Sequence, residues 1–145
     1  MRGNEKVLVT NLAVHEIGKD KLEYAVEHCL VYRLIEKGFK FPYHNFIPAT
    51  LPDYGTGLLS RELEHDIDNL VSRGSLELKS ASPFIAITRS GIQEAKSLVS
   101  KLSEEGEQYE ELKSIVKDAI ESDLHVLLHK CYTSYIRKEY NLAES

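Results

Sequence analysis

The sequence predicts a mainly helical fold that contains one small β-hairpin. Apolar residues recur at three- and four-residue steps along most of the 145 residues, which indicates amphipathic helices. Two short β-prone segments, 76–79 and 84–87, are joined by a four-residue link, as in a hairpin. The content of 42% hydrophobic and 28% charged residues is typical of a globular protein. We therefore expect a single domain over 1–145, with a core at 5–105 and a C-terminal helical extension at 106–140.

The first expected helix covers residues 5–16, where two patterns compete. The valines of this segment favour a strand, whereas Leu8, Leu12 and His15 are spaced as on one side of a helix. We predict a helix.

The second expected helix runs from Asp20 to Gly38. Asp20 and Glu23 have the D-x-x-E spacing of a capping box, and apolar residues then follow at helical spacing until the glycine.

Residues 39–57 are predicted to form a long connection without regular structure, because prolines, glycines and aromatic residues are concentrated there. We expect the aromatic residues to pin this loop to the core, and a recognition surface is the alternative. These residues are Phe39, Phe41, Tyr43, Phe46 and Tyr54.

Four further helices are expected. Ser60 is a good N-cap for a helix that ends before Gly74, and Thr88 can cap a helix that runs from the hairpin to Gly106. Two more helices, at 107–121 and from Ser122 to about Ile136, close the chain.

The order helix, helix, long loop, helix, hairpin, helix is that of a winged helix-turn-helix. In that fold the third helix is presented to a DNA groove and the hairpin forms the wing beside it. Residues 66–77 followed by 85–92 resemble the passage from recognition helix to wing in winged-helix regulators of the MarR and PadR kind. In those families a helix ends in a short Gly turn before the first wing strand, and the second strand leads into an L-T-x-x-G helix start.

A second resemblance covers about residues 6–136. Residues 54–70 look like the Y-G-P-x-S-x-E-L-x-x-D-L-D-x-L passage of YwgA-like proteins, and 127–135 look like their closing L-L-x-x-V-Y-x-x-Y helix. The present chain has Thr56 or Gly57 in place of the motif proline and one extra residue before Ser60. The resemblance implies a small winged-helix protein with relatives among antitoxin-type and proteolysis-adaptor proteins.

DNA binding by a transcriptional regulator is the first functional expectation. The net charge of −5 and the pI near 5.7 argue against non-specific coating of nucleic acid, which depends on phosphate neutralisation. The helix at 60–73 carries four carboxylates and two arginines, which is the main objection. A winged helix that binds a protein instead of DNA is therefore the alternative. The residues expected to contact DNA are Arg61, His65, Asn69, Arg73, Lys79 and Arg89.

We also expect a homodimer, because proteins that resemble PadR dimerise through helices after the wing. The last helix has an apolar stripe that suits such an interface, although the same stripe can cover the chain's own core. The stripe consists of Leu124, Leu127, Leu128 and Tyr135.

No catalytic, metal or cofactor site is expected. His125 and His129 share a helix face, but Cys131 points away from it, and no nucleotide-binding or nucleophile motif occurs. We expect Cys29 and Cys131 to be small buried residues without a disulfide. No run of about 18 apolar residues exists, so we expect a cytoplasmic protein with no membrane partner.

Overall fold

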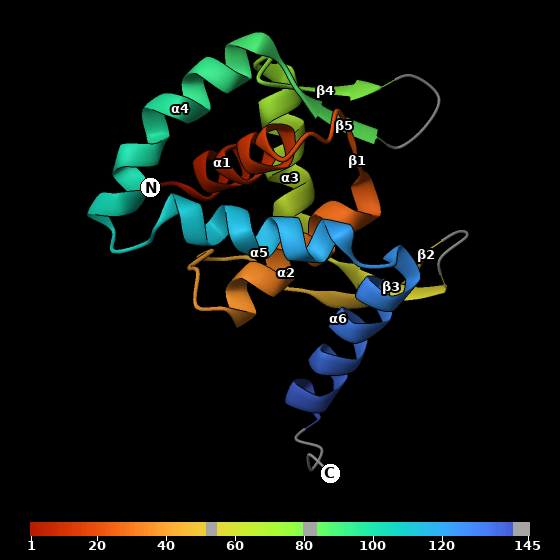
Figure 1. Cartoon of the computed structure of the whole chain (residues 1–145). Helices are drawn as coiled ribbons and strands as arrows, with labels where there is room; N and C mark the ends of the chain where they lie inside the picture. Colours follow the sequence, from red (N-terminus) through yellow and green to blue (C-terminus); the bar gives the residue numbers. More distant parts are fainter. Residues whose placement is uncertain (52–54, 80–83, 141–145) are drawn as a thin grey trace.

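Helix α1 (Gly3–Glu16) lies at the centre of the molecule, and the other elements are arranged around it (Figure 1). The computed structural model describes residues 1–51, 55–79 and 84–140. Every residue from Lys6 to Val14 is buried, so α1 is enclosed on all of its faces. The predicted helix is confirmed. A helix that is buried all round lacks an amphipathic stripe, which explains why the pattern at 5–16 was ambiguous.

Further helices and strands follow α1. In chain order they are β1 (Leu22–Glu23), α2 (Tyr24–Glu36), β2 (Ile47–Leu51), β3 (Gly55–Leu59), α3 (Arg61–Ser72), β4 (Leu76–Lys79), β5 (Phe84–Ile87), α4 (Arg89–Glu104), α5 (Tyr109–Glu121) and α6 (Leu124–Glu139). The mainly helical fold with a small hairpin is therefore confirmed, with a second hairpin in addition.

The predicted hairpin of β4 and β5 is extended to a three-stranded antiparallel sheet in the order β1-β5-β4. The third strand changes the start of α2. Leu22 pairs with Ile85, and α2 begins at Tyr24 with Glu23 as its N-cap. The capping box predicted at Asp20 is wrong, because pairing with β5 holds Leu22 and Glu23 in an extended conformation. The link at 80–83 lies outside the described residues.

Thr88 and Gly91 fix the contact between the start of α4 and the residues that follow α3. Thr88 caps α4 as predicted, since its hydroxyl accepts a hydrogen bond of 3.0 Å from Gly91 N. The same hydroxyl donates to the carbonyl of Ser75 at 3.1 Å. A Cβ at Gly91 would lie 2.0 Å from that carbonyl oxygen, so only glycine permits this close approach.

The prediction that 39–57 lacks regular structure is wrong for part of this segment. Residues Ile47–Leu51 and Gly55–Leu59 form the antiparallel hairpin of β2 and β3, which packs on α2 and α6. Sequence analysis missed these strands because prolines and glycines, which are unfavourable in strands, lie within them.

The aromatic residues of this segment divide into two groups. Phe39, Phe41 and Phe46 are buried in the core, which confirms the prediction that they pin the loop. Tyr43 is 89% exposed and has a positive φ of 71°, and Tyr54 lies outside the described residues.

The C-terminal helices pack on the rest of the chain. Helix α5 contacts α1 and α2, and α6 contacts α2 and β3 (Figure 1). Asp123 caps α6 through Val126 N at 3.2 Å, one residue later than predicted. None of the helices within the described ranges is long and apolar enough to cross a membrane.

Cys29 and Cys131 form a disulfide, contrary to our prediction of two unlinked cysteines. Both side chains are buried as expected, but α2 and α6 pack together and bring their Cα atoms to 6.2 Å, within the range that a disulfide spans. The bond joins positions 102 residues apart, so it constrains a long loop of the unfolded chain.

A buried ion pair connects α1 with the turn between α4 and α5. Lys6 is 2% exposed, and its Nζ lies 2.5 Å from Glu107 Oε1 and 2.5 Å from the carbonyl oxygen of Lys40. Glu107 Oε2 in turn accepts a hydrogen bond of 2.8 Å from Lys40 N. The Glu107 carboxylate therefore neutralises the charge of Lys6 in the central helix and also holds the backbone at Lys40, just after α2, by a hydrogen bond.

The substitution Glu107→Gln leaves the Lys6 ammonium buried without a counter-charge while keeping an acceptor for Lys40 N. We expect a loss of about 3 kcal/mol in the free energy of unfolding, measured by urea denaturation. Adding Lys6→Met removes the buried charge and should recover part of this loss. Glu104→Gln, at an exposed position of α4, is the matched control and should leave stability unchanged. Equal stability of Glu107→Gln and Glu104→Gln would contradict the role given to this ion pair.

Candidate functional site

Helix α3 has one face in the core and one in solvent. Leu63, Ile67 and Leu70 are fully buried, and the helix packs on α1 and β4. The opposite face is exposed, and its residues are Arg61, His65, Asp68, Asn69 and Ser72. This exposed surface, called the α3 face below, is the surface that the sequence predicted to be functional.

The start of α3 is fixed by two hydrogen bonds. Ser60 Oγ accepts from Leu63 N at 3.2 Å, which confirms the predicted N-cap, and Ser60 N donates to Nδ1 of His28 at 2.9 Å. Burial lowers the pKa of His28 to about 4, so its ring is neutral and can accept this bond. Helix α2 thereby sets the position at which α3 begins.

The segment before β2 is bound to the first half of α3. His44 Nε2 lies 2.6 Å from Asp66 Oδ2, and Asn45 N donates to Glu62 Oε1 at 2.6 Å. Burial disfavours the charged His44 ring, but the hydrogen bond and charge of Asp66 outweigh it and raise the pKa of His44. Sequence analysis missed this pair, because its members are 22 residues apart and no local pattern joins them.

Three of the six residues predicted to contact DNA, Asn69, Arg73 and Lys79, have a side-chain partner within the fold. The side-chain oxygen of Asn69 accepts a hydrogen bond of 2.9 Å from Asn4 Nδ2. Arg73 forms an ion pair with Glu94, whose other carboxylate oxygen accepts from Ser75 Oγ at 3.0 Å. The charge of Arg73 is therefore already neutralised by α4.

All six predicted residues are exposed. Arg61 and His65 line one shallow hollow together with Tyr43. Lys79 lies at the end of β4, where its Nζ is 2.9 Å from Glu77 Oε1, and Arg89 begins α4. The structure thus brings Arg61 and His65 together and leaves Lys79 and Arg89 on other elements.

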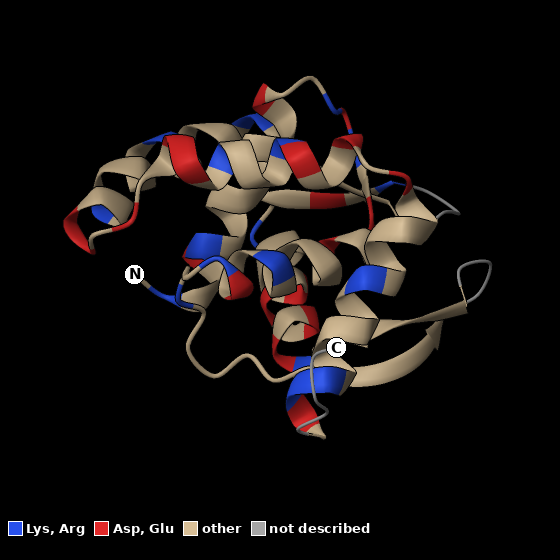
Figure 2. Cartoon of the chain, turned by 60° about the horizontal axis from the view of Figure 1, so that its bottom comes forward, with Lys and Arg blue, Asp and Glu red and all other residues tan. Residues whose placement is uncertain are grey.

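On and beside the α3 face, carboxylates without an ion pair among the described residues outnumber the one arginine, Arg61. Glu62, Glu64 and Asp68 form no ion pair within the residues that the structure describes. Burial raises the pKa of the neighbouring Tyr24 phenol, and the charges of Glu64 and Asp68 raise it further. Figure 2 shows basic and acidic residues interspersed along the helices, with no basic stripe on the visible side.

The four residues predicted for a dimer interface have different positions. Leu127 and Leu128 are 4% and 1% exposed and belong to the core of the same chain, so they are not available to a second copy. Leu124 is partly buried beside a surface cavity, and Tyr135 packs edge-on against Tyr32 with ring centroids 6.4 Å apart. The homodimer stays a prediction that these two leucines no longer support.

Within the described ranges, no group of three or more His, Cys, Asp or Glu side chains is placed to hold a metal ion. No protein-family model, curated protein or solved structure matches the chain.

The pair of His44 and Asp66 predicts a pH-dependent stability. Because the pKa of His44 is raised in the folded state, the contribution of this pair is complete below the unfolded pKa of about 6.5. It is lost as the pH rises through the folded pKa. Asp66→Asn should therefore cost about 1–3 kcal/mol near pH 5.5, and progressively less at higher pH.

The measurement is urea denaturation of both proteins from about pH 5.5 to pH 9, a range that spans the ordinary pKa of histidine. Asp68→Asn, two residues along the same helix and exposed, is the matched control and should show no such trend. A cost of Asp66→Asn that is constant with pH would mean that His44 is not charged in the folded protein.

Proposed function

We propose that this chain is a winged-helix protein whose α3 face binds a second protein with a basic surface. The observation that carries the proposal is the excess of acidic over basic residues on α3, the helix that a winged helix ordinarily presents to its partner. Four carboxylates and two arginines lie between Ser60 and Arg73. Arg73 is paired with Glu94 and Asp66 with His44, so three carboxylates remain against one arginine.

The winged-helix assignment is supported by the order of the elements. Leaving aside the hairpin of β2 and β3, the chain follows the order α1, β1, α2, α3, β4, β5. The three strands form one antiparallel sheet in the order β1-β5-β4, beside the exposed helix α3. In this interpretation α3 corresponds to the recognition helix and β4 with β5 to the wing.

A protein partner fits this surface better than DNA does. Phosphate groups must be met by unpaired Lys and Arg side chains, and each carboxylate at the contact adds repulsion. Glu64 and Asp68 lie on or beside the α3 face without a cationic partner among the described residues. Complementary charges across an interface speed association and select the partner, so a basic protein surface is the expected counterpart.

DNA binding is the second candidate, because Arg61, His65 and Arg89 are exposed near the elements that would enter or flank a groove. Such binding would depend on a small number of basic side chains that contact phosphate groups. Arg73→Ala would then leave the salt dependence of DNA binding unchanged, whereas Arg61→Ala would reduce its slope by about one.

The protein-binding proposal can be tested by site-specific crosslinking in the producing cells. A photoreactive amino acid at Ser72, an exposed position on the α3 face, should yield one discrete crosslinked protein that mass spectrometry can identify. The same group at Lys117, exposed on α5, is the matched control and should not yield that product. Adding Asp68→Lys to the Ser72 probe should reduce the yield several-fold, because it reverses a charge at the centre of the face.

Crosslinks from position 72 to nucleic acid, or the absence of a product specific to that position, would contradict a protein partner at α3. An undiminished yield with Asp68→Lys would show that the acidic charge does not select the partner.

A further inference from the structure

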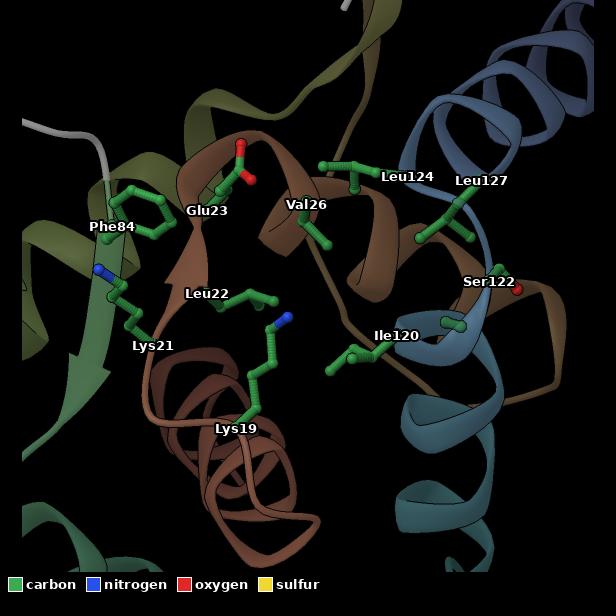
Figure 3. A pocket seen from close by; sticks show the side chains of 11 residues that line it. Lys19, Lys21, Leu22, Glu23, Val26, Phe84, Ile120, Ser122, Leu124 and Leu127 are labelled. Carbon is green, nitrogen blue, oxygen red and sulfur yellow. The ribbon is translucent and has the colours of Figure 1, made fainter.

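A cavity of about 200 Å³ lies between the three-stranded sheet and the turn that joins α5 to α6 (Figure 3). One wall is formed by Leu22 and Glu23 of β1, Val26 of α2 and Phe84 of β5. The other wall comes from the end of α5 and the start of α6, and it includes Ile120, Leu124 and Leu127. The cavity is distinct from the α3 face, since the two share no residue.

The floor and one side of this cavity are apolar. Leu22, Val26 and Leu127 are each less than 5% exposed and form its floor, while the partly buried Ile120 and Leu124 form its side. Figure 3 shows these side chains directed toward one another across the space. An apolar chain or ring that entered the cavity would therefore gain contact on both sides and leave water.

The rim of the cavity is cationic. Lys19 extends its ammonium group toward the apolar side chains, and Lys21 lies over the ring of Phe84 with Nζ 4.4 Å from the centroid (Figure 3). Neither lysine forms an ion pair within the described part of the chain. Among the described residues of the lining, Glu23 is the one with an acidic side chain, and its carboxylate turns away from Lys19 in Figure 3.

We propose that this cavity binds a small monocarboxylate with an apolar body, whose carboxylate meets the Lys19 ammonium. The charge identifies the ligand class, because an unpaired ammonium above an apolar floor is complementary to one anionic group attached to a hydrocarbon. The size limits the ligand, since about 200 Å³ equals roughly seven water volumes and lies below the roughly 300–1,000 Å³ of pockets for drug-sized molecules. A carboxylic acid with about six carbons fits this space.

The position of the cavity also gives binding a structural consequence. A bound ligand touches β1 and β5 on one side and the α5–α6 turn on the other, so it joins the sheet to the C-terminal helices. Ligand that binds the folded state alone raises its stability, and occupancy should therefore raise the unfolding temperature.

Hexanoate is the probe, and hexanamide, which has nearly the same shape without the charge, is its matched neutral control. In isothermal titration with the full chain, hexanoate should bind with a stoichiometry of one and at least about tenfold more tightly than hexanamide. In ¹H–¹⁵N spectra the amide signals of Leu22, Val26, Ile120 and Leu127 should shift on addition of hexanoate.

Lys19→Gln keeps most of the side-chain stem and should weaken hexanoate binding at least about tenfold. Ile120→Trp fills the cavity and should abolish binding, and Lys117→Gln, an exposed lysine of the same helix that does not line this cavity, should have no effect. The Lys19→Gln comparison is decisive by itself if Ile120→Trp does not fold, because Lys19 is exposed. The proposal is overturned if hexanoate does not bind, if hexanamide binds equally well, or if Lys19→Gln binds hexanoate like the wild type.

Discussion

The burial of α1 on all of its faces is the constraint on which the rest of the structure depends. A helix in the centre must be covered by several elements at once, and here α3, α4, α5 and β5 share that task. The one charged side chain buried in α1, Lys6, requires an anion in the interior, which Glu107 supplies from the turn between α4 and α5. The C-terminal helices are thereby tied to the centre of the fold by packing and by charge.

The central helix α1 also binds α2, and α2 in turn fixes the start of α3. Asn11 of α1 donates a hydrogen bond of 2.6 Å to Glu27 of α2, and burial raises the pKa of Glu27 to about 7. The next residue of α2, His28, accepts the bond that fixes the first turn of α3. Each side chain in this series is buried, so the orientation of the exposed helix follows from the core. A rigidly held acidic surface loses little conformational entropy on binding, which suits the proposed recognition of a protein.

Local signals in the sequence predicted much of the fold. Ser60 and Thr88 each cap the helix that their position indicated, and the hairpin of β4 and β5 was evident from its β-prone residues. These features depend on neighbours within a few residues, which a single sequence displays. The candidate helix was likewise placed correctly by its apolar stripe of Leu63, Ile67 and Leu70.

Features that depend on distant partners were missed. The two-residue strand β1 exists through pairing with β5, and the disulfide of Cys29 with Cys131 follows from the packing of α2 on α6. For the same reason the sequence did not reveal that Glu94 neutralises Arg73 or that His44 pairs with Asp66. These long-range pairs occupy one arginine and one carboxylate of the segment 60–73, so they decide which charges are left for a partner.

The most direct measurement is a salt-dependent titration of the full chain with a fluorescent duplex from the DNA upstream of its own coding sequence. Random duplex serves as competitor. The acidic α3 face predicts no saturable binding even at low salt, because few unpaired cations face the phosphates. Tight binding that resists the competitor would contradict the protein-binding proposal and would identify the chain as a DNA-binding protein.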